Sequence, residues 1–568
     1  MYLIRFYSIF FLLASVCLTT NAQDLEKINW KQPIKITGGL NITNTFYESK
    51  GMAARRDPWY WLINGNINAN VFGVVSVPVS FQVSQQNKSY TQPFNQFGMS
   101  PHYKAWTVHA GYRSLQYSTY TVGGNVWLGG GIEYKPAQSP FYASILYGRF
   151  QKGVTDYGTN GLVSGTPEYE RWGYGAKIGY QKNGRSVAFQ IFRGKDDANS
   201  VSDSIAKVAN ISPGMNFVWG ITTKQALSQH IVVDLEFAMS AYTFDYRTDQ
   251  SDLISSKYLN GLGSFFTTNS STKVNNAFQS SINYNQKNYQ LKFAYRRVGP
   301  QYSTMGSVFL NNDIEDISAG ITWKMLQQKM TASITGGVQR NNLDNKLTQK
   351  AVRNAFAASL MYAPSKRLNL MSQYSNFLSN TKFNNTNVTA NQLSLQQNSD
   401  SIRYNQVTQN ASLNANYTIG DSLVKHTIMS TVSWQRGRDS RGNNSDFYSG
   451  NLGYVITLVA PQLSFNVNLL STYNTSNGKL NQMLGPNLGV SKKINKIARL
   501  SYNASYISNS VEHSNTGYTL TNRIGISVKQ GKHHSLNIDL NWMQREQKQA
   551  SQSKSSEWRG NIVYAYVF

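Results

Sequence analysis

The chain has 568 residues, with 54 lysines and arginines against 28 acidic residues, and only 14% of all residues are charged. A chain of this length would ordinarily contain several domains joined by linkers, but no linker of distinct composition interrupts it, which disfavours a multi-domain soluble protein. The single cysteine, Cys17, falls in an N-terminal leader, so the mature chain is expected to contain no disulfide, thiolate metal site or cysteine nucleophile.

Residues 1–22 have the pattern of a secretory signal peptide. Arg5 supplies a positive charge, an apolar run follows from Phe6 to Val16, and small residues precede a cleavage site after Ala22. The apolar run is too short for a transmembrane helix. Residues 23–32 are then expected to form a short periplasmic segment. Residues 33–568 follow one continuous strand pattern.

In this strand pattern, roughly ten residues of apolar and polar alternation are followed by a break. Clear apolar faces, counted at every second residue, run through Val75 to Val83, Ile231 to Met239, Leu463 to Leu469 and Leu536 to Trp542. Such strands have one face toward lipid and one toward a wet lumen, which also explains the negative mean hydropathy. The pattern predicts an all-β fold: a large single-chain, up-and-down transmembrane β-barrel of about 26 antiparallel strands, or about 24 without a weak pair around Arg113 to Val122.

The breaks are alternately short and long. The short breaks have tight-turn sequences and are predicted to be periplasmic turns; they include Lys182-Asn183-Gly184, Gln286-Lys287-Asn288, Ala363-Pro364-Ser365, Ala460-Pro461 and Gln530-Gly531-Lys532. The long breaks are predicted to be extracellular loops; they are Gln86 to His102, Asp196 to Pro213, Asp245 to Lys273 and Ser379 to Ser401. Both termini are therefore expected in the periplasm of an outer-membrane protein.

A barrel of this size encloses a lumen too wide for side chains alone to fill. The short segment before the first strand argues against a plug domain and against large periplasmic domains. A loop folded inward, or a separate partner protein, is therefore expected to gate the lumen. The apolar residues of the longest loop favour that loop as the gate, although packing against neighbouring loops is an equal alternative; they are Tyr258, Leu259, Leu262, Phe265 and Phe266.

The excess of basic residues suggests anionic partners. Many lie at strand ends and in turns, where they are expected to contact lipid phosphates, including those of lipopolysaccharide. Nucleic acid is not expected as a partner of a secreted barrel. Parity also assigns basic and acidic residues together to the lumen, which predicts a mixed rather than a basic interior; the candidates are Lys292, Arg296, Lys135, Glu133, Asp234, Glu236, His109 and Asp539.

Catalytic and metal-binding patterns are weak. His109 shares an inward face with small residues, and His230 shares one with Asp234 and Glu236, but no nucleophile elbow or zinc motif accompanies either histidine. A structural hydrogen bond in the lumen is the favoured interpretation. The chain is therefore predicted not to be an enzyme and to need no cofactor or metal.

Two further patterns concern packing. The run Gly129 to Gly131 within one strand predicts a bend or a close approach by another segment, for which Pro93 to Tyr103 is the suggested neighbour. Tryptophans near strand ends, Trp127 among them, are interpreted as belts at the membrane interfaces.

The last strand carries Tyr564, Tyr566 and the terminal Phe568 on one face. This ending resembles the signal by which outer-membrane barrels are recognised by the barrel-assembly machinery. Together with the Ala22-Gln23 junction and the Tyr- and Asn-rich strands, it resembles outer-membrane barrels of the Bacteroidota. The resemblance implies outer-membrane residence and implies no binding residues.

Three functions remain open from the sequence. The first is a channel that passes a hydrophilic solute and is gated by its own loops. The second is a translocation or assembly barrel whose lumen is filled by a secreted or surface partner protein. The third, a barrel hydrolase, has the least support.

Overall fold

The protein is described from a computed structural model. The structure describes residues 30–85, 93–155, 167–249, 266, 268–307, 310–347, 349–383, 402–440, 442–548 and 553–568. The predicted signal peptide and most of the segment 23–32 lie outside the described residues.

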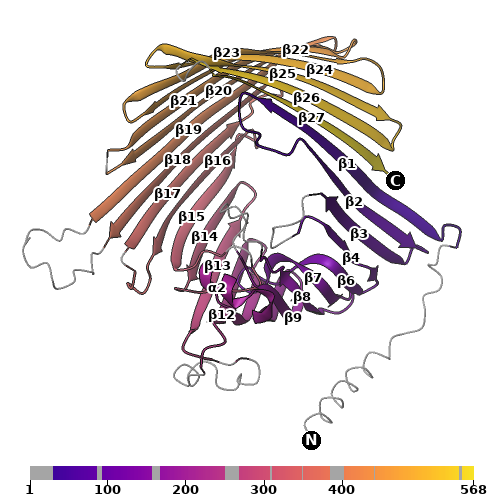
Figure 1. Ribbon diagram of the computed structural model, residues 1–568, viewed down its shortest axis with the longest axis vertical. Coiled ribbons are helices and arrows are strands. Elements are labelled where there is room, and N and C mark those ends of the chain that lie inside the picture. The colour runs from indigo at the N-terminus through magenta and orange to yellow at the C-terminus, as the bar shows by residue number, and fades with distance from the viewer. Residues whose placement is uncertain are drawn as a thin grey trace, which may run out of the picture.

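One antiparallel sheet of 27 strands makes up most of the described chain, and its strands run side by side around the molecule (Figure 1). Its first half consists of β1 (Ile34–Lys50), β2 (Trp59–Val71), β3 (Val75–Ser84), β4 (Gln96–Met99), β5 (His102–Tyr103), β6 (Trp106–Gln116), β7 (Gly123–Tyr134), β8 (Phe141–Gln151), β9 (Glu170–Lys182), β10 (Arg185–Asp197), β11 (Met215–Ala226), β12 (Ile231–Thr243), β13 (Thr272–Asn285) and β14 (Tyr289–Val298). Its second half consists of β15 (Ile314–Met325), β16 (Met330–Asn341), β17 (Gln349–Tyr362), β18 (Leu368–Phe383), β19 (Ile402–Gly420), β20 (Val424–Asp439), β21 (Asn444–Leu458), β22 (Leu463–Ser476), β23 (Lys479–Lys493), β24 (Ala498–Val511), β25 (Ser514–Gln530), β26 (His534–Gln547) and β27 (Ser553–Val567).

The sheet closes on itself. Each strand pairs with its sequence neighbours, except that β4 and β5 each pair with β3 and β6, and β1 pairs with β27 from Gly39 opposite Val567 to Lys50 opposite Ser556. Closure provides hydrogen-bond partners for the backbone groups of both edge strands, which a sheet needs in order to span the hydrocarbon core of a membrane. The predicted up-and-down barrel is confirmed.

The strand count also agrees with the prediction, but for a different reason. β4 and β5 are two short pieces that both lie between β3 and β6, so the 27 strands occupy 26 positions in the barrel. The weak pair predicted around Arg113 to Val122 is wrong, because β6 ends at Gln116 and the chain then leaves the sheet. One barrel position is instead filled by β4 and β5, which lie almost entirely inside the segment predicted as the loop Gln86 to His102.

The connections are short at one end of the barrel, whereas the other end has the long connections together with two-residue turns such as Asn477-Gly478. The short breaks form turns as predicted, for example between β9 and β10 at Asn183 and Gly184, which both adopt positive φ. The long β10–β11 connection contains a 3-10 turn, η2 (Ala198–Ser200), and a short helix, α2 (Asp203–Ala209). Within the described residues no helix has the length and apolar character needed to cross a membrane.

Outward-facing positions form an apolar belt. Large apolar side chains remain exposed at every second position of successive strands; examples are Ile145, Ile178, Phe189, Ile221, Phe293, Ile317, Val432, Leu452 and Leu488. The alternate positions of the same strands carry mostly small and polar residues. An exposed apolar belt around a closed barrel is the lipid-facing surface of a membrane β-barrel.

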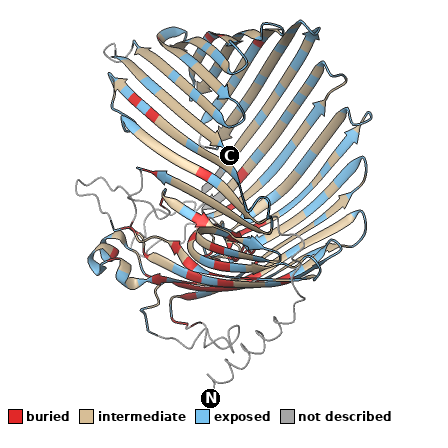
Figure 2. Ribbon diagram, turned by 90° about the vertical axis from the view of Figure 1, so that its right-hand side faces the viewer, coloured by how far each residue is buried: buried red, intermediate tan, exposed pale blue. Residues whose placement is uncertain are grey.

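Burial is uneven around the barrel. Figure 2 shows the buried residues gathered in the lower part of the molecule and sparse in the upper part. The buried clusters draw on β6 to β15 and on their long connections. One wall therefore has a layer of chain packed on it.

Candidate functional site

Two connections cover the inner face of this wall. The first lumen segment, residues 117–122, joins β6 to β7, and the second lumen segment is the described part of the connection from β14 to β15, residues 299–307 and 310–313. Their contacts fall on Asn216, Val218 and Ala238, which alternate with the exposed apolar positions of β11 and β12. The two segments therefore lie on the lumen side of the wall.

The two lumen segments are hydrogen-bonded to each other. The Tyr302 hydroxyl donates to the Tyr120 carbonyl oxygen at 2.7 Å, and the Thr304 hydroxyl donates to the Thr121 carbonyl oxygen at 2.8 Å. The Gly123 amide, at the start of β7, donates to the Gly306 carbonyl oxygen at 3.0 Å. The second segment thus satisfies backbone carbonyl groups of the first, and the start of β7 satisfies one of the second, groups that would otherwise be buried without partners.

Polar side chains of the barrel wall hold the second lumen segment. Asn216 is fully buried, and its side-chain oxygen accepts from the Met305 amide at 3.1 Å while its nitrogen donates to Ser240 Oγ at 2.8 Å. The Ser240 hydroxyl in turn donates to the Ser303 carbonyl oxygen at 2.5 Å. Because buried amides pay a full desolvation cost when unpaired, this bonding fixes the position of the segment.

The first lumen segment is held in the same way. The Tyr120 amide donates to Glu236 Oε1 at 3.0 Å, and the Tyr120 hydroxyl donates to Gln279 Oε1 at 3.1 Å. Glu236 is one of the residues that the sequence assigned to the lumen. Its carboxylate binds the protein's own chain.

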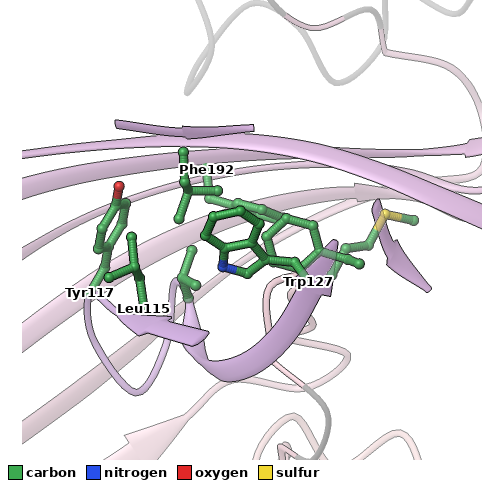
Figure 3. Close-up of a cluster of buried hydrophobic side chains, with 8 residues drawn as sticks. Leu115, Tyr117, Trp127 and Phe192 are labelled. Atoms are coloured by element: carbon green, nitrogen blue, oxygen red, sulfur yellow. The ribbon is translucent and has the colours of Figure 1, made fainter. Parts of the chain in front are cut away.

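Apolar packing completes the layer. Figure 3 shows Leu115, Tyr117, Trp127 and Phe192 converging in one cluster, which also includes Met305 of the second lumen segment. Burying a side chain of this size stabilises a fold by about 1.5–3 kcal/mol. Trp127 is 0% exposed here, so its interpretation as an interface-belt residue is wrong.

A row of glycines makes room for the layer. Gly111, Gly129, Gly148, Gly173 and Gly194 are direct cross-strand partners, one after another, from β6 to β10. A Cβ atom on Gly194 would lie 2.8 Å from Met305 Cβ, and one on Gly148 would lie 2.9 Å from a ring carbon of Trp127. At Gly129 itself a Cβ atom would lie 2.1 Å from the Tyr147 carbonyl oxygen, so the close approach there is by the neighbouring strand β8. The suggested neighbour was wrong, since β6 separates Gly98 from Gly129.

Two tyrosines of the lumen segments are strongly desolvated. Burial raises the pKa of Tyr302 well above its ordinary value, and burial is also the main cause that raises the pKa of Tyr117 to about 12. Both hydroxyls therefore stay protonated at neutral pH. Tyr302 keeps its proton for the hydrogen bond to Tyr120.

Of the five apolar residues in the predicted inward loop, the structure describes Phe266. Phe266 packs with Met215, Phe217 and Ala241, and Phe217 shares parity with the exposed Ile221 on the outer side of β11. Phe266 therefore lies outside the lumen, and the prediction that it points inward is wrong. The other four apolar residues of that loop, Tyr258, Leu259, Leu262 and Phe265, lie outside the described residues.

Several charged residues assigned to the lumen form ion pairs within the wall. Arg296 binds Asp316, and the Arg523 guanidinium Nε lies 2.6 Å from Asp539 Oδ2. Asp234 lies opposite Lys224 in the register of β11 and β12. Lys292 lies opposite Asn283, and Lys135 follows Tyr134 at the end of β7.

His109 joins three strands. Its Nδ1 lies 2.9 Å from the Ser100 hydroxyl, and its Nε2 lies 3.1 Å from Glu133 Oε2. A serine, a histidine and a carboxylate in a chain are the groups of a hydrolase, but this histidine is only 8% exposed. Ser100 lies at the break between β4 and β5, so the chain of bonds ties the broken strand to β6 and β7. Among the described residues, no group of three or more His, Cys, Asp or Glu side chains is placed to hold a metal.

The C-terminal residues lie at the seam that closes the barrel. Tyr566 is the register partner of Leu40, the Phe568 amide donates to the Gly38 carbonyl oxygen at 3.0 Å, and the Tyr564 hydroxyl lies 2.8 Å from His534 Nδ1. Their role as an assembly signal remains a prediction.

Comparison with known proteins adds no family. No protein-family model matches the chain, and no curated protein matches it. Among solved structures, the chain is similar to the ferric enterobactin receptor of Pseudomonas aeruginosa, with 8% identity over 94% of this chain and 80% of the receptor and a TM-score of 0.39. It is also similar to OprE of Pseudomonas aeruginosa, with 11% identity, 61% and 94% coverage and a TM-score of 0.33, and to the copper transporter OprC, with 6% identity, 94% and 81% coverage and a TM-score of 0.30.

Proposed function

We propose that the protein is an outer-membrane channel for a hydrophilic solute, constricted by its own two lumen segments. The observation that carries this proposal is the hydrogen-bonded layer that Tyr302, Thr304 and Asn216 hold on the inner wall. A porin narrows its path with chain fixed to the barrel, whereas a barrel filled by a partner needs no such layer.

The opposite wall of the lumen is polar, as expected for a water-filled channel. A hollow of about 410 Å³ lies on β16 to β21. It is lined mostly by hydroxyl, amide and small side chains, among them Ser333, Thr335, Ser375, Asn410, Ser412 and Gln435. Such groups exchange hydrogen bonds with water and with polar solutes at little cost.

The orientation belongs to the same proposal. The long connections face the outside of the cell, both chain termini lie in the periplasm, and the apolar belt lies in the outer membrane. The barrel-assembly machinery inserts the chain by its last strand, and basic residues at the rims contact lipopolysaccharide phosphates. None of these steps requires an enzymatic activity.

The confinement of burial to one side supports a second candidate, a translocation barrel whose remaining lumen receives a secreted or surface protein. Permeation separates the two candidates. We expect proteoliposomes containing the purified barrel to admit small neutral sugars and to exclude larger oligosaccharides. Liposomes that stay impermeable to the smallest sugar, while the barrel is folded, would contradict the channel.

A further inference from the structure

At the short-turn end of the barrel, a pocket on the inner wall is lined by five cations. It has a volume of about 590 Å³ and lies on β20 to β25. The cations are Lys425, Lys493, Lys496, Arg499 and Lys529, and the other lining side chains are neutral. This volume is in the range of about 300–1,000 Å³ typical of small-molecule sites.

Register places these cations on the lumen face. Arg499 is the direct partner of both Lys493 and Ser527, and Lys425 is the direct partner of Thr457. These positions alternate with exposed apolar residues such as Leu500 on the lipid side. The positive charges therefore face the aqueous path.

The pairing of Lys493 with Arg499 is unfavourable without an anion. Like charges directly opposite each other on antiparallel strands are about 4.5–5.5 Å apart at Cβ and destabilise the sheet. In the part of the chain that the structure describes, none of the five cations forms an ion pair, and the nearby lumen carboxylate Asp539 is bound by Arg523. At the long-loop end, by contrast, Arg171, Arg340 and Arg436 each have an acidic partner.

We propose that this pocket binds a small multivalent oxyanion, a solute carrying phosphate or several carboxylate groups. Cations of one sign in a concave wall focus the electrostatic potential and raise the local concentration of anions. Lysine and arginine would donate charge-assisted hydrogen bonds, and the hydroxyls of Thr457, Ser464 and Ser527 would complete the shell. The proposal rests on the channel function, in which the pocket lies at the periplasmic mouth.

The test is binding of inorganic pyrophosphate to the purified barrel in non-ionic detergent, measured by calorimetry. Removal of two charge-assisted contacts in the double variant Lys493→Gln/Arg499→Gln is expected to weaken binding by about tenfold or more. The variant also removes a like-charge pair, so it is expected to fold and to unfold at a higher temperature than the wild type. Lys529→Gln is a second, milder variant.

The matched control removes two lysines from short turns at the same end, in Lys287→Gln/Lys329→Gln. An equal loss of affinity in this control would overturn the pocket, because binding would then depend on net charge alone. Unchanged pyrophosphate affinity in Lys493→Gln/Arg499→Gln would also overturn the proposed site. So would a barrel that binds anionic lipid micelles and does not bind pyrophosphate. Calorimetry detects binding without ion conduction. A barrel that binds pyrophosphate but does not conduct ions would therefore contradict the proposed channel function and still support the anion-binding pocket.

Discussion

At the residue scale, Asn216 is the clearest single anchor of the lumen layer. In the wild type, Asn216 Oδ1 accepts from the Met305 amide, and Asn216 Nδ2 donates to the Ala241 carbonyl oxygen at 3.0 Å. The substitution Asn216→Ala removes both hydrogen bonds in a buried site. We expect a loss of about 1–3 kcal/mol of stability. This loss is measured as a decrease in the urea concentration at which half of the refolded barrel is unfolded. Asn466→Ala, on the uncovered wall, is the control, and equal midpoints for the two variants would contradict the anchor.

Gly194 tests the packing of the same layer. In Gly194→Ala the new methyl would lie 2.8 Å from Met305 Cβ, so the second lumen segment must shift. Overpacking of this kind costs about 1–3 kcal/mol. The control is Gly450→Ala, where a Cβ meets nothing within 4 Å. Protease sensitivity of the segment should rise only for Gly194→Ala, and no change would show that the wall does not confine it.

Parity along the strands brought His109 and Glu133 to one face from the sequence alone, and the structure joins them at 3.1 Å. The roles of Asn216 and Trp127 were not predictable. Asn216 accepts a hydrogen bond from the Met305 amide, and Trp127 is buried in one cluster with Phe192. Such contacts join segments far apart in sequence, and periodicity describes only neighbours along the chain.

At the element scale, the two lumen segments stabilise each other through hydroxyl groups. The double variant Tyr302→Phe/Thr304→Val keeps both volumes and removes the bonds to Tyr120 and Thr121. Each bond is worth about 0.5–1.5 kcal/mol, so we expect faster amide exchange at residues 302–306 with little change in the strands. Tyr473→Phe/Thr472→Val on β22 is the control. Exchange that stays at the wild-type rate would refute the mutual support.

Tight-turn residues predicted the short connections because Asn, Gly and Pro fix backbone angles locally. The same reasoning wrongly predicted a pair of strands in the region 113–122. Leu115 and Tyr117 are apolar at alternate positions, yet they are buried under a layer of chain and do not face lipid. The strand position of β4 and β5 was missed because both lie in a stretch that is polar enough to resemble a loop.

At the scale of the whole molecule, alternation and the terminal strand were enough to predict a closed barrel of the observed size. Which connection enters the lumen was not predictable, since the longest and most apolar loop has its described residue Phe266 on the outer side. The entering segments are shorter, and their entry depends on the glycine row and on Asn216, which only the folded wall brings together.

The most direct test of a self-constricted channel is single-channel conductance in a planar bilayer, with wild type beside a variant in which residues 299–313 are replaced by Asn-Gly. Val298 and Ile314 are direct partners, so a two-residue hairpin can join β14 to β15. We predict stable open steps for the wild type and larger, noisier steps for the variant. If neither folded barrel conducts ions, or if the two have the same conductance, the protein is not a channel constricted by its own lumen segments.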